Sequence, residues 1–93
     1  MEYKLLYHPD IKKHDLPKIP RNIQEIIRRA IEDRLAQDPF VYGEPLRQSL
    51  KGHRKLRVGD YRIIYRIAGS QIIILKIGHR KEVYVKVFSR LNS

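Results

Sequence analysis

The stretch KLRVGDYRIIY, residues 55–65, carries alternating hydrophobic and polar side chains on either side of Gly59-Asp60. Alternation with a period of two is typical of a strand that buries one face. Gly-Asp is a pair that favours the two-residue turns of tight hairpins. We therefore expect an antiparallel hairpin in which residues 53–58 pair with residues 61–67.

A two-residue turn fixes the register of this hairpin, so the two faces can be assigned. Arg57 falls opposite Arg62, and like charges that face each other across a strand pair are destabilising. Because a fold that keeps such a pair needs an anion nearby, this face favours phosphate, which arginine binds with two parallel hydrogen bonds. Exposed strands often carry Lys and Arg because these residues prevent pairing with another strand edge. That explanation covers one or two of the residues on this face, but not all five that the register places there. The predicted core face carries Leu56, Val58, Tyr61, Ile63 and Tyr65, and the other, exposed face carries His53, Lys55, Arg57, Arg62 and Arg66.

Residues outside the hairpin predict a third meander strand and a first strand. Residues 71–77 contain the run IIIL, which is apolar on both faces and indicates a covered central strand. Residues 2–8 read as the first strand, ended by Pro9, and residues 78–81 read as a loop. The sheet is therefore expected to bury one face and to leave the other partly open.

Helices are expected before the hairpin and at the chain end. Asp10 can cap a short helical piece that Pro17 ends. From Pro20 to Pro39 the hydrophobic residues recur at steps of three and four, as on one face of an amphipathic helix; they are Ile23, Ile26, Ile27, Ala30, Ile31 and Leu35. Residues 38–45 read as a loop, and the last segment as a short, weakly stable helix. The predicted fold class is α+β, with an antiparallel-rich sheet, two N-terminal helices on one face and a short C-terminal helix.

The charge is divided unevenly along the 93 residues. Residues 1–45 have eight basic and eight acidic side chains, whereas residues 46–93 have twelve basic and two acidic ones, so the later half carries the whole net charge of +10. A field of one sign attracts polyanions, with RNA, DNA or an acidic protein as the candidates. The length fits one domain, residues 1–93. The chain has no cysteine, no long apolar run and no leading hydrophobic block, so we expect a cytoplasmic protein without membrane contact.

The residues also restrict the chemistry. Asp60 and Glu82 are the two acidic residues of the later half, and a metal-dependent nuclease normally presents a cluster of carboxylates. We expect neither metal nor cofactor. RNA cleavage without metal requires a base for the 2′-OH, cations for the phosphorane and an acid for the leaving oxygen. The base could be Tyr84, a lysine, a histidine such as His53 or His79, or Glu82.

The segments GDYRIIY, residues 59–65, and GHRKEVY, residues 78–84, resemble the RelE/ParE toxin superfamily of bacterial and archaeal toxin–antitoxin modules, and its RelE branch most of all. The resemblance implies a RelE-like toxin domain with the activity of a ribosome-dependent mRNA endonuclease. Such toxins cut the codon in the ribosomal A site and leave a 2′,3′-cyclic phosphate and a 5′-OH.

The resemblance also implies roles for particular residues. Arg62 matches the arginine that holds the scissile phosphate, Arg80 the arginine of the following loop, and Tyr84 the tyrosine that stacks on or activates the nucleotide. Lys55 matches a lysine assigned to charge stabilisation or proton transfer. His53 stands where well-studied relatives have a second lysine. The predicted RNA-binding set is His53, Arg57, Arg66, His79 and Lys81.

The implied partners are an acidic RelB-like antitoxin, mRNA in the ribosomal A site and rRNA. The toxin alone would be a monomer, and with antitoxin a hetero-oligomer in which the antitoxin covers the basic face. Two alternatives remain open. A ParE-like toxin shares the fold but inhibits DNA gyrase by protein contact, without needing the Arg62, Arg80 and Tyr84 set. A non-catalytic nucleic-acid-binding module of the same fold would bind RNA or DNA and leave it intact.

Overall fold

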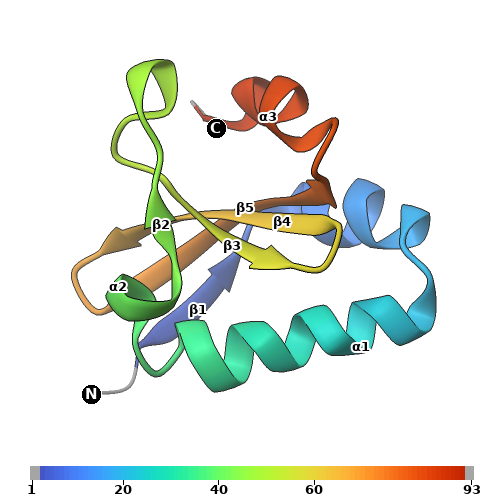
Figure 1. The fold of residues 1–93 in the computed structure, drawn as a ribbon, viewed down its shortest axis with the longest axis horizontal. Coiled ribbons are helices and arrows are strands. Elements are labelled where there is room, and N and C mark those ends of the chain that lie inside the picture. The colour runs from blue at the N-terminus through green and yellow to red at the C-terminus, as the bar shows by residue number, and fades with distance from the viewer. Residues whose placement is uncertain (1–2, 92–93) are drawn as a thin grey trace.

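The computed structural model describes residues 3–91, which form a five-stranded sheet between helices (Figure 1). The strands are β1 (Lys4–Tyr7), β2 (Glu44–Pro45), β3 (Arg54–Val58), β4 (Tyr61–Ala68) and β5 (Gln71–His79). Their order across the sheet is β1-β5-β4-β3-β2, with β1 parallel to β5 and every other pair antiparallel. The predicted α+β fold class and the central place of the third meander strand are confirmed.

The β3–β4 hairpin has the predicted register. Arg57 pairs with Arg62 and Val58 with Tyr61, and Gly59 adopts a positive φ of 59° in the turn between them. A positive φ is strained for most residues but not for glycine, which explains the glycine at this turn. At its far end β5 continues to His79, so the pair 78–79, which was expected in a loop, extends the strand.

One face of the sheet carries the main core, as predicted. Leu56, Ile63 and Tyr65 are buried there against α1 (Arg21–Ala30) and the π-helical turn Ile31–Leu35 that continues it. The periodicity correctly placed Ile27 and its helical neighbours. Ile26, however, is 52% exposed, because the buried stripe of the helix passes beside it.

Two short elements precede α1. A π-helical turn, Ile11–Asp15, and a 3₁₀ turn, Leu16–Lys18, form what we call the connecting turns. The expected cap at Asp10 is wrong, since its side chain makes no capping hydrogen bond. Pro17 lies inside the 3₁₀ turn and does not end it, because the first positions of a helical turn tolerate a missing N–H.

The expected loop 38–45 contains a helix and a strand. Its prediction failed because Pro39 was read as the end of the long helix, whereas it begins α2 (Pro39–Tyr42), capped by the Asp38 carboxylate. The edge strand β2 follows and sets Glu44 opposite Lys55. This segment therefore brings an acidic side chain beside the basic residues of β3.

The second sheet face is more covered than predicted. The C-terminal helix consists of α3 (Val83–Lys86) and the 3₁₀ turn Val87–Arg90, and it lies across the sheet from α1 (Figure 1). Val83 and Val87 pack on Ile64 and Leu75 in a second core cluster. The predicted short helix is confirmed, and part of the supposedly open face lies beneath it.

Candidate functional site

Arg62 lies at the centre of the basic face, with Arg57 opposite it on β3 and Gly78 opposite it on β5. Its side chain was expected to be exposed, but the residue is only 7% exposed. One terminal nitrogen donates hydrogen bonds to the backbone carbonyls of Gly59 and Tyr61, both at 2.9 Å. The guanidinium is therefore held back against the β3–β4 turn, and the prediction of an exposed arginine is corrected.

Within the described part of the chain, this buried cation lacks a neutralising carboxylate. Arg62 forms no ion pair with an acidic side chain anywhere in residues 3–91. Arg57, directly opposite, is exposed and adds a second positive charge. Burying a charge without an opposite charge is costly, so the position favours an anion from outside the chain.

Lys55 and Tyr84 lie together on this face. The Lys55 ammonium stands 5.8 Å from the centroid of the Tyr84 ring, and Tyr84 is half-buried against the second core cluster. The same ammonium is 4.0 Å from the Glu44 carboxylate on β2. An acidic side chain of β2 therefore lies beside the Lys55 end of this face.

Arg80 approaches the same turn that holds Arg62. Its backbone N–H donates to the Asp60 carbonyl at 2.8 Å, and its guanidinium Nε lies 3.9 Å from the Asp60 carboxylate. Most of the Arg80 side chain is exposed, so it can reorient. The structure thus places Arg62 and Arg80 at one turn and brings Lys55 and Tyr84 together as a second pair.

The other predicted contact residues are more scattered. His53 precedes β3, and its Nδ1 is buried without a hydrogen-bond partner in residues 3–91. His79 lies opposite Tyr61 on the main-core face, in edge-to-face contact at 5.9 Å, and accepts a hydrogen bond from the Lys81 N–H. Arg66 is exposed toward the far end of β4. His79 is therefore on the opposite face from Arg62.

Glu82, one of the candidate bases, is engaged on its own helix. Its carboxylate lies 3.1 Å from the Lys86 ammonium. The hydrogen bond and charge of Lys86, with smaller contributions from Lys18 and His79, hold the Glu82 pKa below its ordinary value. A lower pKa makes the carboxylate a weaker proton acceptor, which disfavours Glu82 as the base.

A buried charge network behind the site was not predicted. Asp15 accepts hydrogen bonds from the Lys76 ammonium, from both terminal nitrogens of Arg90 and from the backbone N–H of Ile77. Burial alone would raise the Asp15 pKa, but the hydrogen bonds from Arg90, Ile77 and Lys76 together hold it below its ordinary value. A lysine inside the apolar run of a covered strand was the sequence signal, because such a cation requires a partner.

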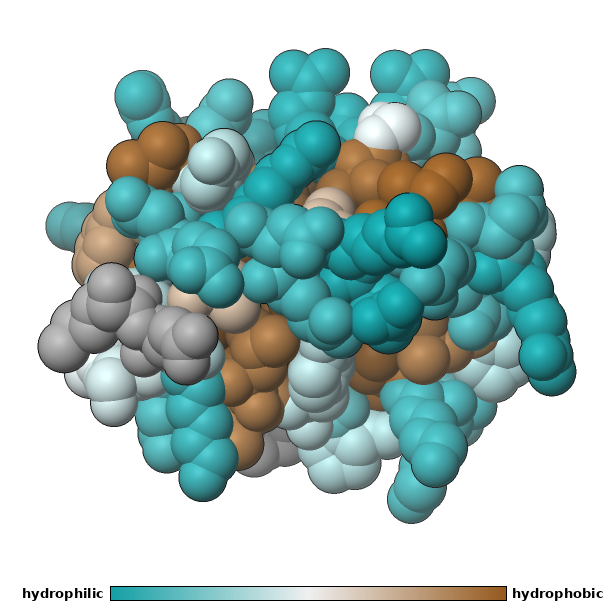
Figure 2. Space-filling model, turned by 90° about the horizontal axis from the view of Figure 1, so that it is seen from below, coloured by the Kyte–Doolittle hydropathy of each residue, from teal (hydrophilic) through white to brown (hydrophobic). Residues whose placement is uncertain are grey.

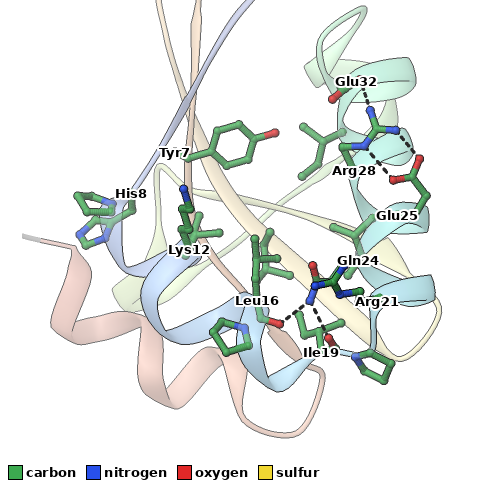
Figure 3. A pocket seen from close by; sticks show the side chains of 17 residues that line it. Tyr7, His8, Lys12, Leu16, Ile19, Arg21, Gln24, Glu25, Arg28 and Glu32 are labelled. Carbon is green, nitrogen blue, oxygen red and sulfur yellow. Dashed lines mark hydrogen bonds and ion pairs between the residues drawn. The ribbon is translucent and has the colours of Figure 1, made fainter.

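A large groove opens between the connecting turns and α1 (Figure 3). Its volume is about 1300 Å³, and it is lined by apolar residues including Ile11, Ile27 and Ile31. Lys12 projects from the connecting turns and Arg21 from α1 at its rim. The space-filling view from below shows hydrophobic side chains exposed on either side of a hydrophilic band (Figure 2).

No group of three or more histidine, aspartate or glutamate side chains in residues 3–91 could hold a metal ion. No helix in the described part of the chain has the length and hydrophobicity needed to span a bilayer.

This architecture is that of the toxins of type II toxin–antitoxin systems. The chain belongs to the family described as "ParE toxin of type II toxin-antitoxin system, parDE", whose model matches residues 5–84. The toxin RelG of Mycobacterium tuberculosis is 36% identical over 75 residues, covering 77% of this chain and 85% of RelG. The toxin RelE of the same organism is 32% identical over 72 residues, covering 75% of this chain and 74% of that toxin.

Solved structures share the fold. The toxin–antitoxin complex RelBE2 of Mycobacterium tuberculosis contains a chain that superposes with a TM-score of 0.79 at 30% identity, covering 86% of this chain and 100% of that one. A free mutant of the E. coli toxin RelE gives a TM-score of 0.76 at 17% identity, covering 97% and 94%. The RelB–RelE antitoxin–toxin complex of Methanococcus jannaschii gives a TM-score of 0.67 at 26% identity, covering 86% and 95%.

Proposed function

We propose that this toxin is a metal-independent endoribonuclease that cuts mRNA on the ribosome. The observation that carries the proposal is the buried Arg62 guanidinium, which within residues 3–91 has backbone carbonyls but no carboxylate as partners. A scissile phosphate would supply the missing negative charge. The similarity to toxins named RelG and RelE supports the RNase assignment.

The proposed reaction divides among four side chains. The ribose 2′-OH attacks the adjacent phosphorus, the new O2′–P bond forms and the P–O5′ bond breaks. Arg62 and Arg80 neutralise the extra charge of the phosphorane, which is where preorganised donors lower a barrier most. Lys55 and Tyr84, which lie together, serve the two proton transfers: one group takes the 2′-OH proton and another gives a proton to O5′. The products are a 2′,3′-cyclic phosphate and a 5′-OH.

The chemistry of the product ends tests this mechanism directly. The protein is expressed in cells without its antitoxin, and cleavage sites in cellular mRNA are mapped by primer extension. We expect translation arrest, cuts within translated codons, and 2′,3′-cyclic phosphate ends. Products with 3′-OH and 5′-phosphate ends would instead indicate metal-dependent hydrolysis and contradict the proposal.

Gyrase inhibition is the second candidate function, because the matching family model is described as a ParE toxin. A supercoiling assay with purified DNA gyrase separates the two candidates. Inhibition of supercoiling without RNA cleavage would favour the gyrase candidate. Salt-dependent RNA binding with neither activity would favour a non-catalytic module.

We propose that the partner is an acidic RelB-like antitoxin and that one amphipathic segment of it occupies the groove beside α1. Three of the similar solved structures are complexes with RelB antitoxins or a RelB peptide. Glu25 and Glu32 also line the groove, but both pair with Arg28. The apolar floor, with Lys12 and Arg21 as the other charged side chains of the lining, fits a helix that has one apolar face and acidic flanks. The net charge of +10, which residues 46–93 carry, favours an acidic partner for the chain as a whole and does not by itself select this groove.

Charge reversal at the rim tests the groove. Lys12→Glu combined with Arg21→Glu should weaken binding of the acidic protein encoded by the adjacent gene about tenfold or more. Lys13→Glu is the matched control, since Lys13 is exposed on the same turn but does not line the groove. Equal affinities for the double variant and the control would exclude this docking site.

A further inference from the structure

The Asp15 carboxylate joins three distant parts of the chain. β1 ends its pairing with β5 at Tyr7 and Ile74, and the connecting turns then bring Asp15 alongside β5. There the carboxylate accepts the backbone N–H of Ile77 at 2.9 Å and the Lys76 ammonium at 2.9 Å. Asp15 thus takes the place beside β5 that β1 has left.

Arg90 meets the same carboxylate from the end of the C-terminal helix. Its two terminal nitrogens donate to the two carboxylate oxygens at 2.6 Å and 2.8 Å, and one of them also donates to the Leu75 carbonyl at 3.1 Å. The Arg90 and Asp15 side chains are 7% and 2% exposed. This two-pronged geometry fixes orientation as well as distance, which a lysine could not do.

The network holds the helix that carries Tyr84. Tyr84 lies in the first turn of the C-terminal helix, and Arg90 lies at its end. The helix packs on the sheet through Val83 and Val87, and Tyr84 and Leu91 are partly buried against the same cluster. Apolar contacts of this kind are not directional, so a short helix held by them alone can slide or tilt. A buried ion pair instead favours one arrangement of its partners, even where it adds little stability.

We propose that Asp15 and Arg90 are positioning residues that seat the C-terminal helix so that the Tyr84 ring stays beside the Lys55 ammonium. The inference rests on the proposed RNase function and adds two residues that touch neither RNA nor the reacting atoms. A shift of about 1 Å at a reacting group lowers a rate by up to about 100-fold, so a modest loss of seating has a large effect.

The decisive variant is Arg90→Lys, which keeps the buried charge but removes the fork. Lys86→Met is the matched control, because it breaks an exposed ion pair with Glu82 on the same helix. We expect Arg90→Lys to lower the single-turnover cleavage rate about 10-fold to 100-fold while RNA affinity stays within about twofold. Lys86→Met should leave the cleavage rate unchanged.

A double-variant cycle with Tyr84→Ala distinguishes positioning from general damage. If Arg90 acts through Tyr84, Arg90→Lys should change the rate of the Tyr84→Ala protein by no more than about twofold. An equal loss in both backgrounds would overturn the proposal. An Arg90→Lys protein that does not fold, as judged by circular dichroism, would also overturn it, because the fork would then hold the whole fold together.

Hydrogen exchange separates this proposal from the proposed function. In Arg90→Lys the amides of residues 83–90 should exchange faster, and those of β4 should be unchanged. This measurement needs no RNA, so it tests the seating even if the wild-type protein fails to cut mRNA. Unchanged exchange in residues 83–90 would contradict the seating role itself.

Discussion

Arg62 and Arg90 are equally buried, at 7% and 6% exposure, yet they have opposite kinds of partners. Arg90 places both terminal nitrogens on the Asp15 carboxylate. Arg62 donates to two backbone carbonyls and has no carboxylate partner in the described part of the chain. A paired buried cation serves the fold, whereas an unpaired one is costly to the fold and suited to binding an anion. This difference between the partners of Arg62 and Arg90 supports the proposed binding of the scissile phosphate by Arg62.

Asp15 should make the stability of this protein sensitive to acid. Its pKa is lower in the folded chain than in the unfolded chain, so its contribution is present above pH of about 4 and is lost as the pH falls through the folded value. We expect the free energy of unfolding, measured by urea titration, to fall as the pH is lowered below about 4. Asp15→Asn should remove a large part of that dependence. A wild-type pH profile retained in the variant would show that other carboxylates are responsible.

Among the helices and strands, the sequence predicted those elements whose side chains repeat with a regular local period. The alternation around Gly59-Asp60 gave the β3–β4 register residue for residue, because a two-residue turn leaves no other pairing. The helical period predicted α1 but wrongly placed Ile26 on its buried face. The residues at the border of the buried face depend on how the helix is rotated about its axis over the sheet. The two-residue strand β2 has too few residues to show a period at all.

The rotation of α1 predicts unequal effects of two adjacent isoleucines. Ile27 is 1% exposed and Ile26 is 52% exposed. Ile27→Ala should lower the free energy of unfolding by about 2–5 kcal/mol, because it leaves a cavity in the main core. Ile26→Ala should lower it by less than about 0.5 kcal/mol. Urea titrations of both variants check this, and similar losses would contradict the observed rotation.

Gly43 is a packing requirement of the segment between α2 and β2. A Cβ at this position would lie 1.7 Å from the Tyr65 hydroxyl oxygen, which is held by a 2.7 Å hydrogen bond to the Pro39 carbonyl. Gly43→Ala should therefore lower the free energy of unfolding by about 1–3 kcal/mol. Ser49→Ala, at an exposed site outside this segment, serves as the control. A thermal melt of Gly43→Ala equal to that of the control would refute the close approach.

At the scale of the whole molecule, the charge is separated along the sequence but only partly separated in space. Residues 46–93 carry the net charge of +10. Lys76 and Arg90, however, are buried and form ion pairs with Asp15, and Lys55 lies beside Glu44. Charge counting could not foresee these pairs, because they join residues far apart in the chain. The basic surface left for RNA is therefore smaller than the sequence implied.

Salt dependence measures how many cations contact RNA. The logarithm of the binding constant for single-stranded RNA should fall linearly with the logarithm of salt concentration, by about 0.7 for each phosphate neutralised. Arg57→Ala should reduce the slope by about 0.7. Arg29→Ala should not change it, because Arg29 lies on α1 and pairs with Glu25. Fluorescence anisotropy across a KCl series provides the test, and equal slopes for all three proteins would exclude Arg57 from the interface.

The role proposed for Arg62 is to bind the scissile phosphate of mRNA. It is tested most directly by single-turnover cleavage of a defined mRNA on programmed ribosomes, with wild type, Arg62→Ala and Arg29→Ala compared at equal folded concentration. Removing a donor to the phosphorane should slow cleavage about 100-fold or more in Arg62→Ala, while Arg29→Ala cleaves at the wild-type rate. Cleavage by Arg62→Ala at the wild-type rate would contradict the account.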